Sequence, residues 1–338
     1  MFRFRGVVRS SAKLCTINQH VAVRLMSNYT PVTSLLTAAE ALSLFDTPNV
    51  KFVDASFHMN KDVRHAYPEY ISKRIPGSNF IDIDSSEFSN KAIDLPHMMP
   101  SAELFAESIT NLGISNDDHV IVYTGAGSFG APRVWWMFRA FGHGKVSILN
   151  GGLEAWVAAG GPVESGPARA SSPAEKPFRA ELNPKYIASC EDVLKVVGDG
   201  SAQIVDARSS ARFNCLAPEP RPGLPMGHIP GSLNVPFTSI VQLDDFTKFR
   251  SREHILEVFD DAGVIKGCRV IGSCGSGVTA AVLIFALHLI GHKLDHTQIY
   301  DGKFNSWNSS IDIDVSLLCL QVHGQNGAVE ATYPKSKT

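Results

Sequence analysis

Short apolar runs alternate along this chain with longer segments of helical periodicity. Runs of strand length, rich in Val and Ile, predict β-strands at 51–55, 119–123, 146–149, 204–207, 269–272 and 299–300. The intervening patterns predict helices at 101–112, 132–141, 253–262 and 279–290, the first opened by Ser101 with Glu103 in its first turn. Strands that alternate with helices predict an α/β fold, in which a mainly parallel sheet carries helices on both faces.

The second half of the chain repeats the first. Val53-Asp54-Ala55 returns as Val205-Asp206-Ala207, and Ile75-Pro76-Gly77-Ser78 returns as Ile229-Pro230-Gly231-Ser232. Other matches follow in the same order at an offset of about 150 residues, which is too long for a solenoid repeat. We therefore predict a duplicated domain, with copies at 27–165 and 181–312, a Pro- and Ser-rich linker without a fold of its own at 166–180, and a tail at 313–338.

The N-terminus has a composition of its own. Arg3, Arg5, Arg9, Lys13 and Arg24 all precede the first acidic residue, Glu40, and hydroxyl residues lie among them. This composition predicts a mitochondrial transit peptide at 1–26 and a place in the matrix. A basic tail without an address is the alternative. Met26 offers a start for a shorter cytoplasmic form.

Charge and cysteine content exclude several classes of protein. Lys+Arg 31 against Asp+Glu 33 argues against a nucleic-acid-binding domain. Six cysteines without a C-x-x-C pair argue against a zinc site and a disulfide framework, so we interpret them as reduced thiols. The longest apolar run, Val278–Ile290, is shorter than the ~20 residues that span a bilayer and predicts a buried helix. No metal or organic cofactor is expected.

The chemistry is concentrated around Cys274. A predicted strand leads into Cys274-Gly275-Ser276-Gly277, and an apolar helix follows from near Val278. The two glycines allow backbone conformations closed to other residues, so successive amides can converge on the sulfur. The positive end of the helix dipole also favours the thiolate. The same amides would hold the outer sulfur of a persulfide. A buried, inert cysteine beside a tight turn is the alternative.

The segment Cys274-Gly275-Ser276-Gly277-Val278-Thr279-Ala280 resembles the active-site loop of the 3-mercaptopyruvate sulfurtransferases, a family with two tandem rhodanese-type domains. The resemblance covers roughly residues 30–312. It implies that Cys274 carries sulfur as a persulfide, that pyruvate is released, and that reduced thioredoxin, a small thiol or cyanide accepts the sulfur. In the family only the second domain is catalytic. Here Thr124 stands in register with Cys274, so the first copy lacks a thiol.

The resemblance also implies the substrate contacts. Arg212, which precedes Phe213, and Arg221, in Glu219-Pro220-Arg221, match the arginines that bind the substrate carboxylate. The planar guanidinium suits this task because it pairs with a carboxylate through two parallel bonds. The loop residues would complete the substrate site, namely Gly275, Gly277, Val278 and Thr279. The alternative is a pair of ordinary surface arginines. We interpret Arg208 as structural.

The first copy contributes two further candidates. Asp84 in Asp82-Ile83-Asp84 and His97 in Pro96-His97-Met98 match residues that line the family's active site. The resemblance thus implies a relay of Ser276, His97 and Asp84 that handles a proton. Alternatively, Asp84 caps a turn and His97 is a loop histidine with structural bonds. We interpret His228 as structural.

Three other functions fit the loop less well. A thiosulfate sulfurtransferase is expected to carry basic residues directly after the cysteine, because thiosulfate is a dianion, whereas this chain has Gly275 and Ser276. A cysteine-dependent phosphatase needs an arginine where this chain has Ala280. A binding module without catalysis has no use for the Cys274 loop together with Arg212 and Arg221, and loss of turnover on alkylation of Cys274 would exclude it.

Overall fold

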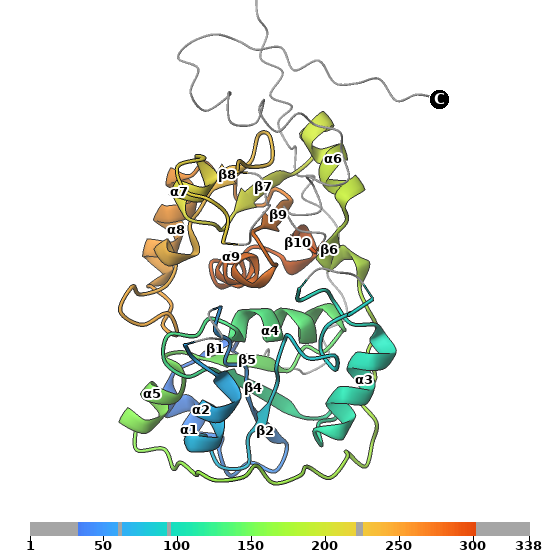
Figure 1. Ribbon diagram of the computed structural model, residues 1–338, viewed down its shortest axis with the longest axis vertical. Helices are drawn as coiled ribbons and strands as arrows, with labels where there is room; N and C mark the ends of the chain where they lie inside the picture. Colours follow the sequence, from blue (N-terminus) through green and yellow to red (C-terminus); the bar gives the residue numbers. More distant parts are fainter. Residues whose placement is uncertain (1–32, 60–62, 93–95, 221–225, 302–338) are drawn as a thin grey trace, which may run out of the picture. The chain divides into compact units, whose positions relative to one another are not determined.

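The computed structural model describes residues 33–59, 63–92, 96–220 and 226–301. This part of the chain forms two five-stranded sheets with the same strand order and only parallel pairs (Figure 1). The first sheet has the order β1-β5-β4-β2-β3, with β1 (Leu35–Leu36), β2 (Val50–Asp54), β3 (Asn79–Phe80), β4 (His119–Tyr123) and β5 (Val146–Leu149). The second has the order β6-β10-β9-β7-β8, with β6 (Ile187–Ala188), β7 (Gln203–Asp206), β8 (Leu233–Asn234), β9 (Val270–Ser273) and β10 (Thr297–Tyr300). The predicted α/β class and the duplication are confirmed.

The helices follow the predicted alternation. The first half contains α1 (Ala38–Ser43), α2 (Ala66–Ser72), α3 (Ala102–Asn111), α4 (Ala131–Ala140) and α5 (Gly152–Ala158). The second contains α6 (Cys190–Asp199), α7 (Ser210–Phe213), α8 (Arg252–Asp261) and α9 (Val278–Leu289), with 3-10 turns at Pro184–Tyr186, Phe237–Ser239 and Leu294–His296. Each predicted helix and strand occurs within one or two residues of its place. Ser101 caps α3 as expected, since its hydroxyl accepts a hydrogen bond from the amide of Leu104.

Several elements were not predicted. The strands β1, β3, β6 and β8 have two residues each, too few to show the alternation by which strands are identified. The missed helices α1, α2, α5 and α7 are also short. The ten-residue α6 begins at a capping box of Ser189 and Asp192, a start signal that the sequence did carry.

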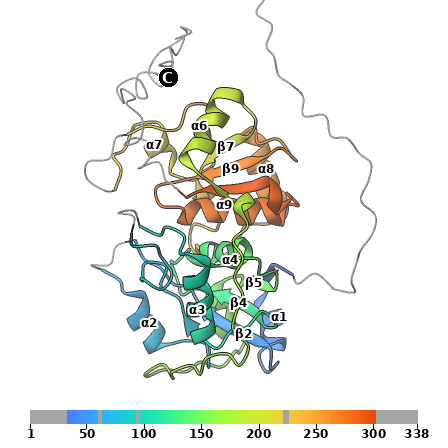
Figure 2. The same ribbon diagram turned by 90° about the vertical axis from the view of Figure 1, so that its right-hand side faces the viewer.

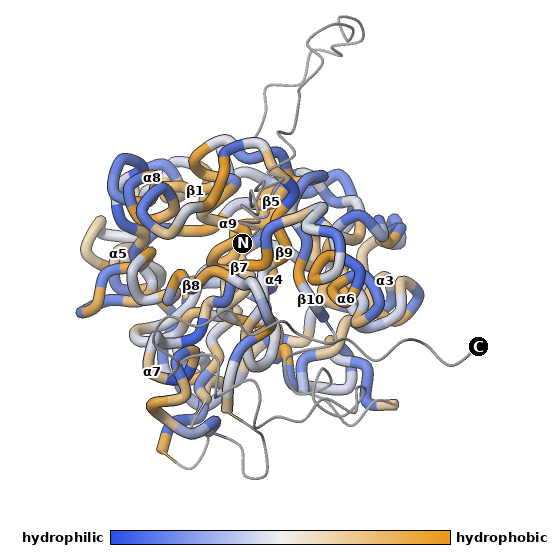
Figure 3. Tube along the Cα trace, turned by 90° about the horizontal axis from the view of Figure 1, so that it is seen from above, coloured by the Kyte–Doolittle hydropathy of each residue, from blue (hydrophilic) through white to orange (hydrophobic). Residues whose placement is uncertain are grey.

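The core continues from one half to the other through α4 and α9. Both helices are buried on almost every side, and Figure 1 and Figure 2 show them next to each other. The ring of Trp135 in α4 meets that of Phe285 in α9 edge to face, with centroids 4.7 Å apart. Figure 3 shows the apolar character concentrated on α9 and on strands such as β5 and β7. The predicted buried helix at Val278–Ile290 is thus confirmed as α9.

The predicted linker has no helix or strand between residues 166 and 180. It is nevertheless fastened to the first half. Arg74 donates a hydrogen bond of 2.7 Å to the carbonyl of Gly166, and Lys176 pairs with Asp117 at 2.8 Å. Polar contacts of this kind leave no periodic apolar pattern, so the sequence did not indicate which part of the protein the linker contacts.

No helix in the described ranges is both long and apolar enough to cross a bilayer. The predicted transit peptide at 1–26, the tail at 313–338 and Arg221 lie outside the described residues.

Candidate active site

The sulfur of Cys274 is held by the loop that joins β9 to α9. Cys274 is 2% exposed, and its Sγ accepts hydrogen bonds from the amides of Gly277 at 3.0 Å and Ser276 at 3.4 Å. Gly277 has a φ of 77° and caps α9 in the left-handed conformation. This region favours glycine, because a side chain would meet the neighbouring carbonyl. The predicted convergence of amides on the sulfur is therefore present.

Gly275 serves a different purpose from the one we predicted. Gly277 has a positive φ, whereas Gly275 does not. The prediction of a backbone conformation closed to other residues is therefore confirmed for Gly277 and wrong for Gly275. Instead, a Cβ at Gly275 would lie 3.0 Å from Nη2 of Arg212. Glycine is needed here so that a guanidinium can approach the loop next to Cys274.

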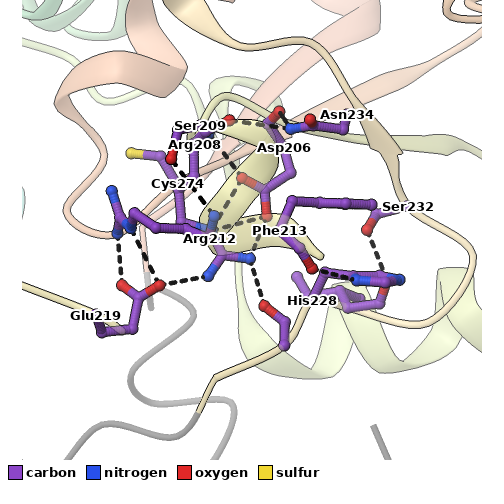
Figure 4. A network of polar contacts seen from close by, with 12 residues as sticks. Asp206, Arg208, Ser209, Arg212, Phe213, Glu219, His228, Ser232, Asn234 and Cys274 are labelled. Atoms are coloured by element: carbon purple, nitrogen blue, oxygen red, sulfur yellow. Dashed lines mark hydrogen bonds and ion pairs between the residues drawn. The ribbon is translucent and has the colours of Figure 1, made fainter. Parts of the chain in front are cut away.

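Arg212 is oriented by a buried carboxylate, Glu219. Nε and Nη2 of Arg212 donate to the two oxygens of Glu219 at 3.1 and 2.5 Å, and Nη1 of Arg208 donates to Glu219 at 2.8 Å. Figure 4 shows Glu219 facing both arginines, with Cys274 close by. Burial acts to raise the pKa of Glu219, but the hydrogen bond and charge of Arg212 and the charge of Arg208 hold this pKa below its ordinary value. Glu219 is thus an anion that fixes Arg212.

The role of Glu219 escaped the sequence analysis. The sequence did contain an indication. Glu219 is an acidic residue that follows Arg208 and Arg212 in the same segment. Nothing in that spacing indicated that its side chain would be 2% exposed and shared by Arg208 and Arg212.

Arg208 has a structural place, in agreement with the prediction. Its side chain is fully buried and donates to Asp206 at 2.6 Å and to the carbonyl of Gly227 at 2.7 Å. Burial works against the charged form, yet Asp206 and Glu219 raise the pKa of Arg208 above its ordinary value. Two arginines and two carboxylates therefore balance, and Arg208 ties the end of β7 to the site.

A cavity of about 150 Å³ lies beside the loop. Five residues predicted for the site are among those that line it: Arg212, Gly275, Ser276, Val278 and Thr279. The first half supplies Phe57, Met59 and Phe129. Gly277 is not among the lining residues and contributes its amide to Sγ instead. Within the described part of the chain, Nη1 of Arg212 makes no hydrogen bond, so this edge of the guanidinium is open to a carboxylate.

His97 and Asp84 form a pair. Nε2 of His97 lies 2.6 Å from Oδ1 of Asp84, and both side chains are largely buried. The ring of Phe57, which lines the cavity, meets the imidazole of His97 edge to face at 5.1 Å. The turn at this place is closed by Asp82, whose Oδ1 accepts from the amide of Asp84.

The remaining candidates have structural contacts. Nδ1 of His228 lies 2.9 Å from the carbonyl oxygen of Phe213, and the two rings stack at 3.8 Å. In the first half, buried Thr124 follows β4 as Cys274 follows β9, and its hydroxyl lies 3.5 Å from the carbonyl of Ser128. Within the described ranges, no group of His, Cys, Asp or Glu side chains could hold a metal ion.

Comparison with known proteins assigns the family. The sequence model of the rhodanese-like domain family matches residues 37–159 and again residues 189–310. The chain belongs to the rhodanese-like family. Each rhodanese-like domain corresponds to one of the two five-stranded sheets with its helices.

Relatives with two activities are almost equally similar. The chain is 42% identical to the rat 3-mercaptopyruvate sulfurtransferase over 260 residues, 76% of this chain and 84% of the relative. It is 41% identical to the rat thiosulfate sulfurtransferase over 263 residues, 77% of this chain and 85% of the relative. The crystal structure of SseA, a 3-mercaptopyruvate sulfotransferase of Escherichia coli, superposes with a TM-score of 0.71 at 38% identity, covering 81% of this chain and 99% of SseA. Identity alone does not separate the two sulfur donors among these rhodanese-like relatives.

Proposed function

We propose that this chain is a sulfurtransferase that takes sulfur from 3-mercaptopyruvate and carries it as a persulfide on Cys274. The observation that carries the proposal is the uncharged loop with an arginine beside it. Sγ is held by two amides, and Arg212 lies against Gly275 with one edge open to the cavity. This arrangement suits a donor whose negative charge lies away from its sulfur.

In the first half-reaction the thiolate of Cys274 attacks the sulfur of 3-mercaptopyruvate. The bond between this sulfur and carbon 3 breaks, its electron pair passes to carbon 3, and the resulting enolate takes up a proton to give pyruvate. Arg212 and Arg221 hold the carboxylate. Ser276, supported by His97 and Asp84, delivers the proton. The persulfide loses its own proton to solvent and remains as an anion near the amides of Ser276 and Gly277.

In the second half-reaction a nucleophile attacks the outer sulfur and releases the thiolate of Cys274. A small thiol leaves as its persulfide and cyanide as thiocyanate. Reduced thioredoxin takes the sulfur on one thiol, and its second thiol then expels hydrosulfide as the disulfide forms. We place this reaction in the mitochondrial matrix because of the Arg-rich N-terminus, with a shorter form from Met26 in the cytoplasm.

Transfer from thiosulfate is the second candidate, favoured by the close identity to the rat thiosulfate sulfurtransferase. The cavity argues against it as the main activity. Gly275 and Ser276, directly after Cys274, carry no charge, so the loop itself adds no cation to Arg212 for the second negative charge of thiosulfate. Initial rates with 3-mercaptopyruvate should therefore exceed those with thiosulfate at equal concentration, and the reverse order would assign the chain to the second candidate.

Sulfur loading tests the nucleophile. Mass spectrometry after treatment with 3-mercaptopyruvate should find one added sulfur atom on Cys274, and Cys274→Ser should abolish both loading and turnover, because a hydroxyl does not form a persulfide. Cys268→Ser is the matched control, since Cys268 lies in the same domain. This substitution should leave both sulfur loading and turnover unchanged. Added sulfur on Cys190, Cys215 or Cys268 instead would contradict the proposal.

A further inference from the structure

Arg133 is a buried cation between the two domains. It lies in α4 and is 1% exposed, with its guanidinium over the ring of Trp136 at 4.6 Å. Its Nη2 donates to Oδ1 of Asp301, at the end of β10, at 3.0 Å and to the carbonyl of His97 at 2.5 Å. A guanidinium removed from water destabilises a protein unless it is paired this closely. A residue of the first domain thus joins His97 to the second domain.

Asp301 holds the same segment from the other side. It is 4% exposed, and its second oxygen accepts a hydrogen bond of 2.9 Å from the amide of Met99. The pair of Arg133 and Asp301 therefore binds the carbonyl of His97 and the amide two residues later. His97 has a φ of 62°, a left-handed conformation that is unfavourable for a residue with a side chain. This pair, here called the clamp, therefore supports the strained backbone of His97, a residue of the proposed relay.

The other edge of Arg133 faces the loop of Cys274. A Cβ at Gly277 would lie 2.9 Å from Nη1 of Arg133 and 3.7 Å from Oδ1 of Asp301. The amide of Gly277 is the one that reaches Sγ at 3.0 Å. Within the described ranges, Nε and Nη1 of Arg133 have no hydrogen-bond partner. The guanidinium is thus packed against the loop at the cost of two unpaired donors.

We infer that Arg133 is a positioning residue that, together with Asp301, fixes where His97 stands relative to Cys274. The inference rests on the proposed function, because it gives His97 a part in the transfer. Arg133 does not touch the substrate cavity and acts through the two groups that it holds. It gives the first domain a part in catalysis beyond that of His97 and Asp84.

A double-mutant cycle tests this inference. His97→Ala should lower kcat for 3-mercaptopyruvate by about 100-fold, the usual contribution of a general acid or base. Arg133→Lys keeps the charge but loses the fork that reaches both His97 and Asp301, so it should lower kcat by at least about tenfold and leave KM nearly unchanged. Because Arg133 acts through His97, the double variant should be no slower than His97→Ala alone. Losses that multiply, or an unchanged kcat in Arg133→Lys, would overturn the inference.

Arg74 provides the matched control. It is equally buried, pairs with Glu164 at 2.9 Å, binds the carbonyl of Gly166 and lies over the ring of Tyr70, all within the first domain and its linker. Arg74→Lys should cost stability without changing kcat. If it slows turnover as much as Arg133→Lys does, the effect is general loosening and the inference is wrong.

Hydrogen exchange gives a readout that does not need turnover. The amide of Met99 should exchange faster in Arg133→Lys than in the parent or in Arg74→Lys, and unchanged exchange would show that no clamp exists. Asp301→Asn serves in the same cycle if Arg133→Lys does not fold. Absence of turnover with 3-mercaptopyruvate in the parent protein would count against the proposed function, whereas the exchange of Met99 would still decide whether Arg133 holds this segment.

Discussion

At the scale of residues, the two domains treat the same aspartate differently. Asp206 ends β7 and pairs with Arg208 at 2.6 Å. Asp54 ends β2 at the equivalent place, where Ser56 stands in the position of Arg208 and donates its amide at 2.8 Å. Burial raises the pKa of Asp54 to about 6, although hydrogen bonds from Ser56 and Tyr123 act to lower it. The first domain has kept a buried carboxyl without the arginine that neutralises it in the second.

This contrast predicts opposite effects of one substitution. The pKa of Asp54 is raised from 3.8 to about 6, so the folded state favours the protonated form, and its stabilising contribution is lost as the pH rises through about 6. Asp54→Asn should then raise the free energy of unfolding at pH 7.5 by roughly 1–3 kcal/mol and bring little gain at pH 4. Asp206→Asn leaves Arg208 buried with one partner fewer and should cost about 3 kcal/mol at pH 7.5.

Urea unfolding at both pH values measures these differences. Loss of stability in Asp54→Asn at pH 7.5 would show that the ionised Asp54 is well paired in the folded protein, contrary to the contrast drawn between the two domains.

At the scale of elements, the strand–helix loops explain why one domain carries sulfur. The loop between β9 and α9 is short and turns its amides toward Sγ of Cys274. The loop between β4 and α4 is longer and uses polar groups to bind the segment that follows β2. The amide of Gly125 donates to Ser56 Oγ, and Ser128 Oγ accepts from the amide of Phe57, both at 2.8 Å. The loop between β4 and α4 supports the fold, and the loop between β9 and α9 holds the nucleophile.

The loop between β9 and α9 should also decide which sulfur donor the protein prefers. Two negative groups ~4 Å apart repel by about 4 kcal/mol at an effective dielectric constant of ~20, which disfavours the dianion thiosulfate at a loop that has no charged residue of its own. Gly275 is unsuited to a new side chain because Arg212 lies against it, whereas Ser276 lines the cavity. Ser276→Lys should therefore raise the ratio of the thiosulfate rate to the 3-mercaptopyruvate rate by about tenfold, and added salt should narrow the change.

Ser276→Met is the neutral control of similar length, which separates the added charge from the lost hydroxyl. An equal ratio in Ser276→Lys and Ser276→Met would show that loop charge does not select the donor. The main ground for preferring 3-mercaptopyruvate over thiosulfate would then be lost.

At the scale of the whole molecule, the two rhodanese-like domains share one hydrophobic core. The largest cluster of buried side chains includes residues of both sheets and meets at α4 and α9. A hydrogen bond of 2.8 Å between the side chains of Ser34 and His288 also joins the halves. A core shared in this way predicts that the domains unfold together.

Phe285→Ala tests the shared core. Phe285 is fully buried against Trp135, so its truncation should cost about 3–5 kcal/mol. The whole unfolding transition should shift, and tryptophan fluorescence, to which the first domain contributes three of the four tryptophans, should report the same midpoint as circular dichroism. Phe52→Ala, on the outer face of the first sheet, should shift both signals in the same way. Separate midpoints for the two signals would show that the domains unfold independently.

The amino-acid sequence by itself determined the local architecture. Apolar periodicity located the long strands and helices, because side-chain burial follows the period of each element. The duplicated motifs indicated two domains, and the setting of Cys274 between a strand and a helix indicated the nucleophile. These features depend on residues close together in the chain. The shortest strands were missed because two residues show no period.

Only the tertiary structure decided which distant side chains meet. It showed that Glu219 is shared by Arg208 and Arg212, that Gly275 makes room for a guanidinium, and that Phe57 and Phe129 of the first domain line the cavity. It also joined Arg133 to Asp301 across 168 positions of the chain. Such contacts follow from the packing of two sheets through α4 and α9, because a buried charge is stabilised by whichever partner the fold brings next to it. No spacing in the sequence records that geometry.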